Sequence, residues 1–565
     1  MFKNKEKDGF SFTLYTGDSA VLLAFNLDDS KIKNLAGFAV KCKTPHIEIY
    51  KTDTHWLKNR LNFTKPLTSK MTLTPDEWTE SDKAPFQTFH WTHFPSAGPG
   101  GNYTYTAYPM YFNANNPNGL DQGTGLSIDV DLNYRICSNL ELGFTRGYIS
   151  SQAYADRFKN APIQPEVKSM DFDTTPYEEQ YIWLGSHARK ILFDLLAQSK
   201  DDESIDLDVF AFDFNLPDMI RDLCVIGSRV RVFLDDSKSH IAPNALEPHT
   251  HEALDNAGVS VKTGCFGRFA HDKVIIQKKD GVPIKVLTGS ANFSIRGLYV
   301  QANSILLFSD PGIAKLYEDA FEQAFNNMNG FKKSAIASRW YSAKLGNGSS
   351  VSISFAPHKT AFSLDRIAEA MESAQNSIFF AMMEIGGSGP VMQILQDLGT
   401  RTNLFSLGTI EKNGELKLFK PGKTGQPPVT SFAYLREKEP STFKEEISGG
   451  PGQVIHHKFV VCDFNQTAPI VFCGSSNMAK GGEISNGDNL IAIQDSDTAI
   501  CYAIEAIRLY DHYRFRSKQA ASTSNNPLSL VGSDTWTEPF YNEKDIKFLE
   551  RTYLSIKTDD DRKTG

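Results

Sequence analysis

Two short stretches of the chain, 185 positions apart (456 − 271), carry the same reactive side chains at the same spacing. Each begins with a His-x-Lys triplet, starting at His271 in the first stretch and at His456 in the second. In both stretches an Asn follows 21 residues after the His (292 − 271 and 477 − 456) and closes a Gly-Ser-x-Asn tetrapeptide. Apolar runs bounded by Gly and Asn indicate buried strands, so each stretch predicts a β-hairpin with polar residues at one end.

These residue types suit phosphoryl transfer. One imidazole can attack an electrophile while the other protonates the leaving group, which divides one difficult step into two easier ones. Lysine and asparagine side chains can stabilise a tetrahedral oxyanion, and Gly-Ser turns let backbone N–H groups approach it. Positioning and charge stabilisation provide most of the catalysis in phosphoryl transfer, so the inventory fits that chemistry.

The two stretches resemble the signature of the phospholipase D superfamily, which is His-x-Lys-x4-Asp followed by Gly-Ser-x-Asn, present twice. The second copy matches in full from His456 to Asn477, with Asp463 at the aspartate position. The first copy has Lys278 where the family has Asp. Since that aspartate is mainly structural in the family, we expect the change to be tolerated.

The resemblance implies a metal-independent phosphodiesterase that acts through a phosphohistidine. One histidine attacks phosphorus, and the other protonates the leaving alcohol and then activates water. The side chains expected to stabilise charge are two lysines and two asparagines, Lys273, Lys458, Asn292 and Asn477. Ser290 and Ser475 can bind the phosphate or only hold the turn, and both roles stay open. Neither a metal nor another cofactor is expected.

The family also places a carboxylate after the Asn, where it orients a catalytic histidine, and Asp488 fits that place. The corresponding stretch of the first copy, 301–303, has no acid, so we do not expect equivalent histidines. A carboxylate fixes the tautomer of its histidine and stabilises the cation, which favours His456 as nucleophile and His271 as acid. In two-lobed family members the first histidine more often attacks, so both assignments stay open. His457 should point to the opposite side of the strand.

Composition is that of an ordinary soluble globular protein, with 40% hydrophobic and 22% charged residues. The net charge of −8 gives no overall basic field for nucleic acid, although a local basic groove is compatible with it. The seven cysteines are scattered and lack zinc-ligand spacing, which indicates buried thiols in a reducing compartment. Without a signal-peptide core or a long apolar run we predict a cytoplasmic protein, with signal-independent export left open.

The pattern of elements predicts an α/β protein: two pseudo-symmetric phospholipase D-like α/β/α lobes preceded by an all-β sandwich. The stretch 99–105, Pro-Gly-Gly-Asn-Tyr-Thr-Tyr, resembles the sixth strand of fibronectin type III and immunoglobulin-like sandwiches. Strands then alternate with helices, as expected for layered sheets. The predicted boundaries are a sandwich at 1–147, a linker at 148–176, lobes at 177–335 and 336–520, and a tail with a short helix at 521–565. An insertion at 410–453 is either a gating or recognition loop or a surface loop.

Three functions follow from this reading. We favour a nuclease that hydrolyses nucleic-acid phosphodiester bonds. A phospholipase D acting on phospholipid head groups is the alternative, although no clear amphipathic membrane helix is present. An inactive binding module is the third, because the first copy lacks both acids. A phosphodiester substrate is the partner expected; no obligatory protein partner is inferred, and the oligomeric state stays open.

Overall fold

The computed structural model describes the chain apart from residue 1 and residues 70, 72–74, 96–99, 116–118, 148–151, 167–168, 384–387, 399–400, 402, 413–414, 420–428, 432–453 and 556–565. Most of the insertion predicted at 410–453 therefore lies outside the described residues. Its described parts are strands, the end of β23 (Phe405–Lys412) together with β24 (Glu415–Phe419) and β25 (Val429–Ser431).

In the described residues, the N-terminal part contains two larger antiparallel sheets and a two-stranded one formed by β6 (Lys58–Asn59) and β7 (Thr79–Glu80). The first has the order β1-β2-β3-β8, with bounds Phe2–Lys7, Phe10–Thr16, Val21–Leu27 and His90–His93. The second has the order β10-β9-β4-β5, with β11 also on β9, and bounds Leu120–Gln122, Asn102–Phe112, Leu35–Lys43, Thr54–Trp56 and Leu126–Asp131. One aromatic core, which includes Phe25, Phe38 and Tyr105, joins them. Along β9, the buried residues Tyr103, Tyr105 and Ala107 alternate with half-exposed neighbours, so one face of the strand lies in the core.

A mixed sheet of eight strands, the first mixed sheet, has the order β12-β13-β19-β18-β17-β14-β15-β16. Its strands are Arg135–Cys137, Leu140–Phe144, Ser304–Phe308, Val282–Gly289, Val274–Lys279, Ile205–Ala211, Val230–Leu234 and Ser260–Thr263. Helices α3 (Glu178–Asp201), α4 (Pro217–Ile226) and α5 (Glu247–Asn256) cover one face, and α6 (Pro311–Asn327) covers the other. Asp310 caps the start of α6, since its side chain accepts from the Ile313 N–H at 2.9 Å.

The second mixed sheet has nine strands in the order β20-β21-β28-β27-β26-β22-β23-β24-β25. The strands not yet given are Tyr341–Lys344, Ser350–Ala356, Asp488–Gln494, Ile470–Gly474, Lys458–Cys462 and Ser377–Met382. Helices α7 (Phe362–Ser373) and α8 (Pro390–Asp397) pack on one face, and α12 (Ser496–Ala521) packs on the other. A short helix, α11 (Lys480–Ser485), precedes β28.

The two mixed sheets repeat one strand order. The run β13-β19-β18-β17-β14-β15 of the first corresponds, strand for strand, to β21-β28-β27-β26-β22-β23 of the second. The hairpin β12–β13 therefore takes the place that β20–β21 takes in the second sheet. Its residues, 135–144, lie before the boundary expected at 147, yet the backbone of β13 pairs with β19 of the first mixed sheet, and the Phe144 N–H also donates to Asp18 at 3.0 Å. The stretch expected to be a linker also contains α2 (Gln152–Phe158), whose Tyr154 is buried against the first mixed sheet's helices.

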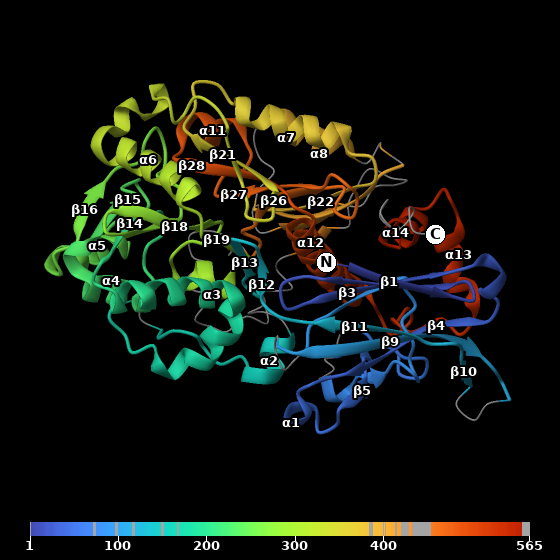
Figure 1. Cartoon of the computed structure of the whole chain (residues 1–565). Coiled ribbons are helices and arrows are strands. Elements are labelled where there is room, and N and C mark those ends of the chain that lie inside the picture. The colour runs from blue at the N-terminus through green and yellow to red at the C-terminus, as the bar shows by residue number, and fades with distance from the viewer. Residues whose placement is uncertain are drawn as a thin grey trace.

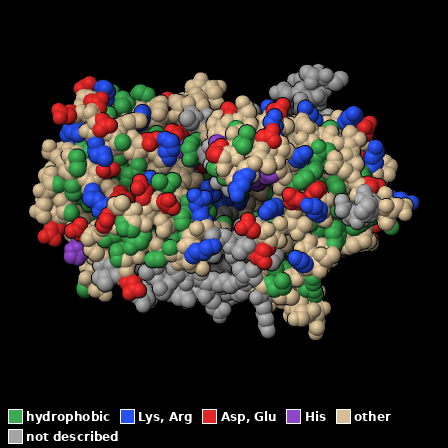
Figure 2. Space-filling view, turned by 90° about the horizontal axis from the view of Figure 1, so that it is seen from below, with side chains coloured by type: hydrophobic (Ala, Val, Ile, Leu, Met, Phe, Trp, Pro, Cys, Tyr) green, Lys and Arg blue, Asp and Glu red, His purple; other side chains and the backbone are tan. Residues whose placement is uncertain are grey.

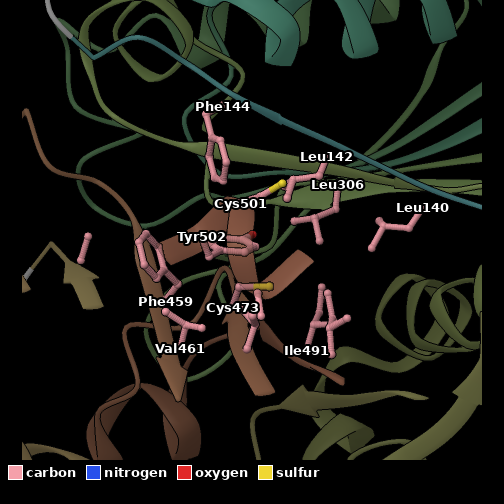
Figure 3. Close-up of a cluster of buried hydrophobic side chains, with 14 of the residues drawn as sticks. Leu140, Leu142, Phe144, Leu306, Phe459, Val461, Cys473, Ile491, Cys501 and Tyr502 are labelled. Carbon is pink, nitrogen blue, oxygen red and sulfur yellow. The ribbon is translucent and has the colours of Figure 1, made fainter. Parts of the chain in front are cut away.

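One hydrophobic core crosses between the mixed sheets (Figure 3). Figure 3 shows Leu142, Phe144 and Leu306 of the first sheet facing Phe459 and other residues of the second. The contact is reciprocal. Tyr502 of α12 packs edge-on against Phe144 at 5.2 Å, and Tyr317 of α6 packs edge-on against Phe355 of β21 at 4.9 Å.

The C-terminal segment returns to the N-terminal sheets (Figure 1). Helices α13 (Glu538–Tyr541) and α14 (Ile546–Leu554) lie beside them, and Trp536 belongs to their aromatic core. His90 of β8 makes hydrogen bonds to Glu550 at 2.9 Å and to Asp511 of α12 at 2.7 Å. The short helix predicted near 546–553 is confirmed, and it is packed against the body of the protein.

The molecular surface carries mixed charge. Figure 2 shows one face, on which Lys and Arg side chains gather around a hollow near the centre. The net charge of −8 is therefore spread unevenly. In the described ranges, every helix is too short or too polar to cross a bilayer.

The shared core generates a prediction about stability. Leu306 is fully buried between the sheets, so Leu306→Ala should lower the free energy of unfolding by about 2–5 kcal/mol, measured by urea titration. Val282→Ala is the control because Val282 is 58% exposed, and it should change the value by no more than about 0.5 kcal/mol. Equal effects of the two substitutions would contradict the shared core.

Candidate active site

Two backbone bridges bring the His-x-Lys stretches together. The N–H of His271 donates to the carbonyl of Gly487 at 2.7 Å, and the N–H of His456 donates to the carbonyl of Ala302 at 3.1 Å. In each case the residue before the histidine forms a parallel bridge to the other mixed sheet. The two histidines therefore enter the interface between the sheets side by side, from opposite strands.

Each imidazole is oriented by a residue of the opposite sheet. His271 Nδ1 lies 2.7 Å from Asp488 Oδ1. His456 Nδ1 lies 2.9 Å from Asn303 Oδ1 and 3.0 Å from the carbonyl oxygen of Ser290. The two orienting residues are equivalent by position, because each follows its motif Asn by eleven residues (303 − 292 and 488 − 477). The pairing is crossed: each motif supplies the partner of the other motif's histidine.

The expectation that Asp488 supports His456 is wrong. Asp488 begins β28, and the bridge between Gly487 and the residue before His271 turns its carboxylate toward His271. Asn303 takes the corresponding place beside His456. The histidines are therefore inequivalent, with the carboxylate on the first of them.

The hydrogen bonds define the tautomers of both rings. Carbonyl and carboxylate oxygens only accept, so Nδ1 of each ring carries the proton and Nε2 is left with a lone pair when the ring is neutral. Burial and the Lys273 charge lower the pKa of His271, and Asp488 opposes this only in part. Burial, then Lys458 and Lys273, hold the pKa of His456 well below its usual range. Both rings are therefore neutral at pH 7, and His456 resists protonation more strongly.

The two lysines make the site strongly cationic. Lys458 Nζ lies 3.3 Å from His456 Nε2 and 2.9 Å from the His456 carbonyl oxygen. Lys273 Nζ donates to the carbonyl oxygen of His271 and lies 4.8 Å from the centre of the Phe212 ring. Burial lowers the pKa of Lys273 to about 8, and burial together with Lys273 lowers the pKa of Lys458 well below its usual value. An anion bound beside these buried lysines would favour their charged forms.

The serines of the two tetrapeptides hold the orienting residues. Ser290 Oγ donates to Asn303 Oδ1 at 2.8 Å, and Ser475 Oγ donates to Asp488 Oδ1 at 3.0 Å. Both serine hydroxyl protons are therefore donated to other side chains of the protein. Of the two roles left open from the sequence, the contacts support the one that holds the turn.

The glycine that opens each tetrapeptide is required by the backbone. Gly289 has φ of 147° and Gly474 has φ of 133°, a region that L side chains rarely adopt. A Cβ at Gly289 would lie 2.2 Å from the Ser304 carbonyl oxygen, and one at Gly474 would lie 2.4 Å from the Asn489 carbonyl oxygen. These glycines let the turn pack directly against the next strand.

The two motif asparagines have different surroundings. Asn292 Nδ2 donates to the Asp213 carboxylate, and Asn292 Oδ1 is buried with no partner in the described residues. Asn477 Oδ1 is likewise buried without a partner there. Buried amide oxygens without partners are uncommon, and such an oxygen can only accept a hydrogen bond from a donor.

The aspartate that differs between the copies is structural. Asp463 accepts hydrogen bonds from the backbone N–H groups of residues 375, 376 and 377, which lead into β22. In the first copy Lys278 forms an ion pair with the buried Asp208 at 2.8 Å. The change from Asp to Lys is thus accommodated by a different charge network behind the site. His457 lies away from the site, bonded to Glu505 of α12 at 2.9 Å, as predicted.

Sequence reasoning missed three residues of the site. Asn303 could have been found from the eleven-residue offset that it shares with Asp488. Asp213 follows β14 and has no motif around it. Asp272 accepts from Asn489 Nδ2 at 2.7 Å, and burial and the Asp488 charge raise its pKa to about 7. Within the described part of the chain, no group of three or more His, Cys, Asp or Glu side chains is arranged to hold a metal ion.

The fold is of the mixed α/β class, and the paired His-x-Lys residues lie at the contact of two mixed sheets. Residues 192–325 match a protein-family model described as "Cardiolipin synthase, PLD-like domain". This part of the chain is therefore similar to a phospholipase D-like domain. It covers the first His-x-Lys stretch, and the second lies outside it.

Individual proteins resemble parts of the chain. Mitochondrial cardiolipin hydrolase of Xenopus tropicalis is 29% identical over 120 residues, which are 21% of this chain. The chain spans about half, 53%, of that protein's length. Among solved structures, the phospholipase D family member Nuc of Salmonella typhimurium is 23% identical, with a TM-score of 0.20 over 23% of this chain and 85% of its own. Phosphatidylserine synthase of Haemophilus influenzae is 12% identical, with a TM-score of 0.37 over 67% of this chain and 93% of its own.

The crossed pairing generates a prediction about titration. Asp488 raises the pKa of His271, so Asp488→Asn should lower that pKa further, and Asn303→Asp should raise the pKa of His456. Both are measured by NMR titration of ¹³C-labelled histidine, with resonances assigned from the His271→Asn and His456→Asn variants. If Asp488→Asn moved the His456 resonance and left that of His271 in place, the crossed arrangement would be contradicted.

Proposed function

We propose that this protein is a phosphodiesterase in which the two histidines act on one phosphate held between Lys273 and Lys458. The observation that carries the proposal is the crossed pairing of His271 with Asp488 and of His456 with Asn303. It provides two neutral imidazoles with their Nε2 atoms available and with unequal partners. One histidine must act as the attacking group and the other as the proton donor, and these two roles require different Nδ1 partners.

His271 is the nucleophile in this proposal. Its Nε2 lone pair attacks phosphorus, and the imidazolium that forms is stabilised by Asp488, which accepts from Nδ1 at 2.7 Å. Asn303 is uncharged and gives His456 no comparable stabilisation as a cation. The assignment reverses the one that the carboxylate argument gave from the sequence, because the carboxylate belongs to the other histidine.

The reaction proceeds in two displacements. A bond forms between His271 Nε2 and phosphorus, the bond from phosphorus to the leaving oxygen breaks, and that oxygen takes a proton from His456 Nε2. Water then loses a proton to His456 Nε2 and attacks phosphorus, and the bond from phosphorus to nitrogen breaks. The products are an alcohol and a phosphomonoester, and both rings return to their starting state.

His456 must be protonated before the first step, although its pKa is low in the free protein. An anionic phosphodiester between the lysines supplies the missing negative charge and raises the pKa of His456. Binding of the substrate thus prepares the acid. Lys273, Lys458, Asn292 and Asn477 stabilise the charge of the transition state, and the scheme assigns no step to a metal.

We propose nucleic acid as the substrate class. Support comes from the Lys and Arg side chains around the hollow in Figure 2, because basic surfaces of this kind bind polyanions. A phospholipid is the second candidate, and the match of residues 192–325 to a cardiolipin synthase domain favours it. Retention of both histidines, both lysines and both asparagines speaks against an inactive binding module.

We further propose the domain plan that accompanies this function. The first mixed sheet and its helices form one phospholipase D-like lobe, and the second mixed sheet forms the other. The hairpin at 135–144 belongs to the first lobe, because β13 is hydrogen-bonded to β19. The fibronectin-like character of the N-terminal sheets, the cytoplasmic location and the absence of an obligatory partner stay predictions.

Substrate class is tested with plasmid DNA, single-stranded RNA and phosphatidylcholine or cardiolipin vesicles, each with EDTA present. Cleavage of a nucleic acid alone supports the nuclease, and release of a head group or of phosphatidic acid alone supports the phospholipase. If none of these substrates, nor a generic phosphodiester with a nitrophenyl leaving group, is cleaved, the proposed function is wrong.

The roles of the histidines are tested by substitution and mass spectrometry. His271→Asn should abolish cleavage, and His456→Asn should reduce it by about 10²–10⁴-fold, the usual contribution of general acid–base catalysis. With a nitrophenyl leaving group, which needs little protonation, His456→Asn should accumulate a phosphoryl adduct on His271. His249→Asn, at an exposed position of α5, is the control and should keep full activity. An adduct on His456 in the His271→Asn variant would reverse the assignment.

A further inference from the structure

Beside the candidate active site, His240 lies between two carboxylates. His240 Nε2 is 2.9 Å from Asp213 Oδ1, and His240 Nδ1 is 2.7 Å from Asp235 Oδ1. Because carboxylates accept only, both ring nitrogens donate and the ring is an imidazolium. Burial alone would lower the pKa of His240, but the hydrogen bonds to Asp213 and Asp235 raise it to about 10. The three side chains form a fixed array with a net charge of −1.

Each carboxylate uses its other oxygen on the first His-x-Lys stretch. Asp213 Oδ2 accepts from Asn292 Nδ2. Asp235 Oδ2 accepts from the backbone N–H of Ala270 at 2.6 Å, and Ala270 is the residue immediately before His271. The array therefore contacts both ends of the first motif, the strand that leads into its histidine and the asparagine that ends it.

The Phe212 ring fills the space between the array and the catalytic side chains. It packs edge-on against His240 at 4.5 Å and against His271 at 4.7 Å. Lys273 Nζ lies 4.8 Å from the centre of the same ring. Displacement of His240 would therefore be transmitted to His271 and Lys273 through one rigid aromatic side chain.

We propose that Asp213, His240 and Asp235 are positioning residues that set the orientation of Asn292 and the placement of His271 for the phosphate. This inference rests on the proposed function. A carboxylate can face only the Nδ2 side of the Asn292 amide, so Asp213 prevents the amide from turning over. The second N–H of Nδ2 is then left for a phosphate oxygen. With the amide reversed, Oδ1 would face the anion and repel it.

His240 is needed because Asp213 is not enclosed. The Asp213 side chain is 35% exposed, so water competes for its oxygens and a lone carboxylate there would be mobile. The imidazolium ties it to the fully buried Asp235, which is fixed by Ala270 and by the Ser237 N–H at 2.9 Å. An exposed carboxylate thereby acquires a fixed position.

The test is a double-mutant cycle between Asp213 and Asn292. Asp213→Asn should lower kcat/KM by about 10–100-fold, the range seen when a group that orients a functional ligand is removed. In the Asn292→Ala background the same substitution should change kcat/KM less than about threefold, because the group it positions is gone. Asp255→Asn, at an exposed position of α5, is the control and should leave both backgrounds unchanged.

Binding of inorganic phosphate, measured by calorimetry, gives a readout that does not depend on turnover. Asp213→Asn should weaken phosphate binding in the wild-type background and leave it unchanged in the Asn292→Ala background. His240→Gln tests the array a second time if Asp213→Asn folds poorly. Equal losses in both backgrounds, or no loss in either, would overturn the inference. A wild-type protein that binds phosphate in this Asp213-dependent way but cleaves no phosphodiester would instead overturn the proposed function alone.

Discussion

The site depends on the pair of short bridges that join the strand ends of the two mixed sheets. At each bridge a histidine of one motif is placed beside the orienting residue of the other. The hydrogen bonds of the bridges fix the position of one sheet relative to the other. The side chains next to the bridges are therefore also held in fixed relative positions. Neither sheet contains a complete catalytic pair by itself, because every imidazole receives its Nδ1 partner from the opposite side.

The same crossing occurs in the hydrophobic core beneath the site. Tyr502 of α12 packs against Phe144 of the first mixed sheet and donates to Ser304 Oγ at 3.2 Å, while Tyr317 of α6 packs against Phe355 of the second. Each helix that follows a motif thus covers its own sheet and also contacts the other one. Apolar burial holds the sheets together over a wide area, and the polar bridges select one register within it.

Local features of this architecture could be predicted from the sequence. Apolar runs and their bounding glycines predicted the motif hairpins, and the alternation of strands with helices predicted the layered sheets. The crossed pairing could not be predicted, since His271 and Asp488 are 217 residues apart and Asp488 was expected to orient the histidine of its own motif. The hairpin at 135–144 was assigned to the β-rich N-terminal part because strand propensity does not reveal which sheet a strand joins. The replacement of an aspartate by Lys278 was expected to be tolerated, and the ion pair with Asp208 shows how the lysine charge is accommodated.

The electrostatics of the free protein explain why a site so rich in cations remains folded. Lys273 and Lys458 are buried close together, and burial lowers the pKa of both. The negative charges of Asp488, Asp213 and Asp272 oppose this effect at Lys273. Asp488 and Asp213 also oppose it at Lys458, while burial remains the largest influence on both lysines. The protein therefore stabilises its own cations only in part, and the remainder of the stabilisation is available to an anion that binds there.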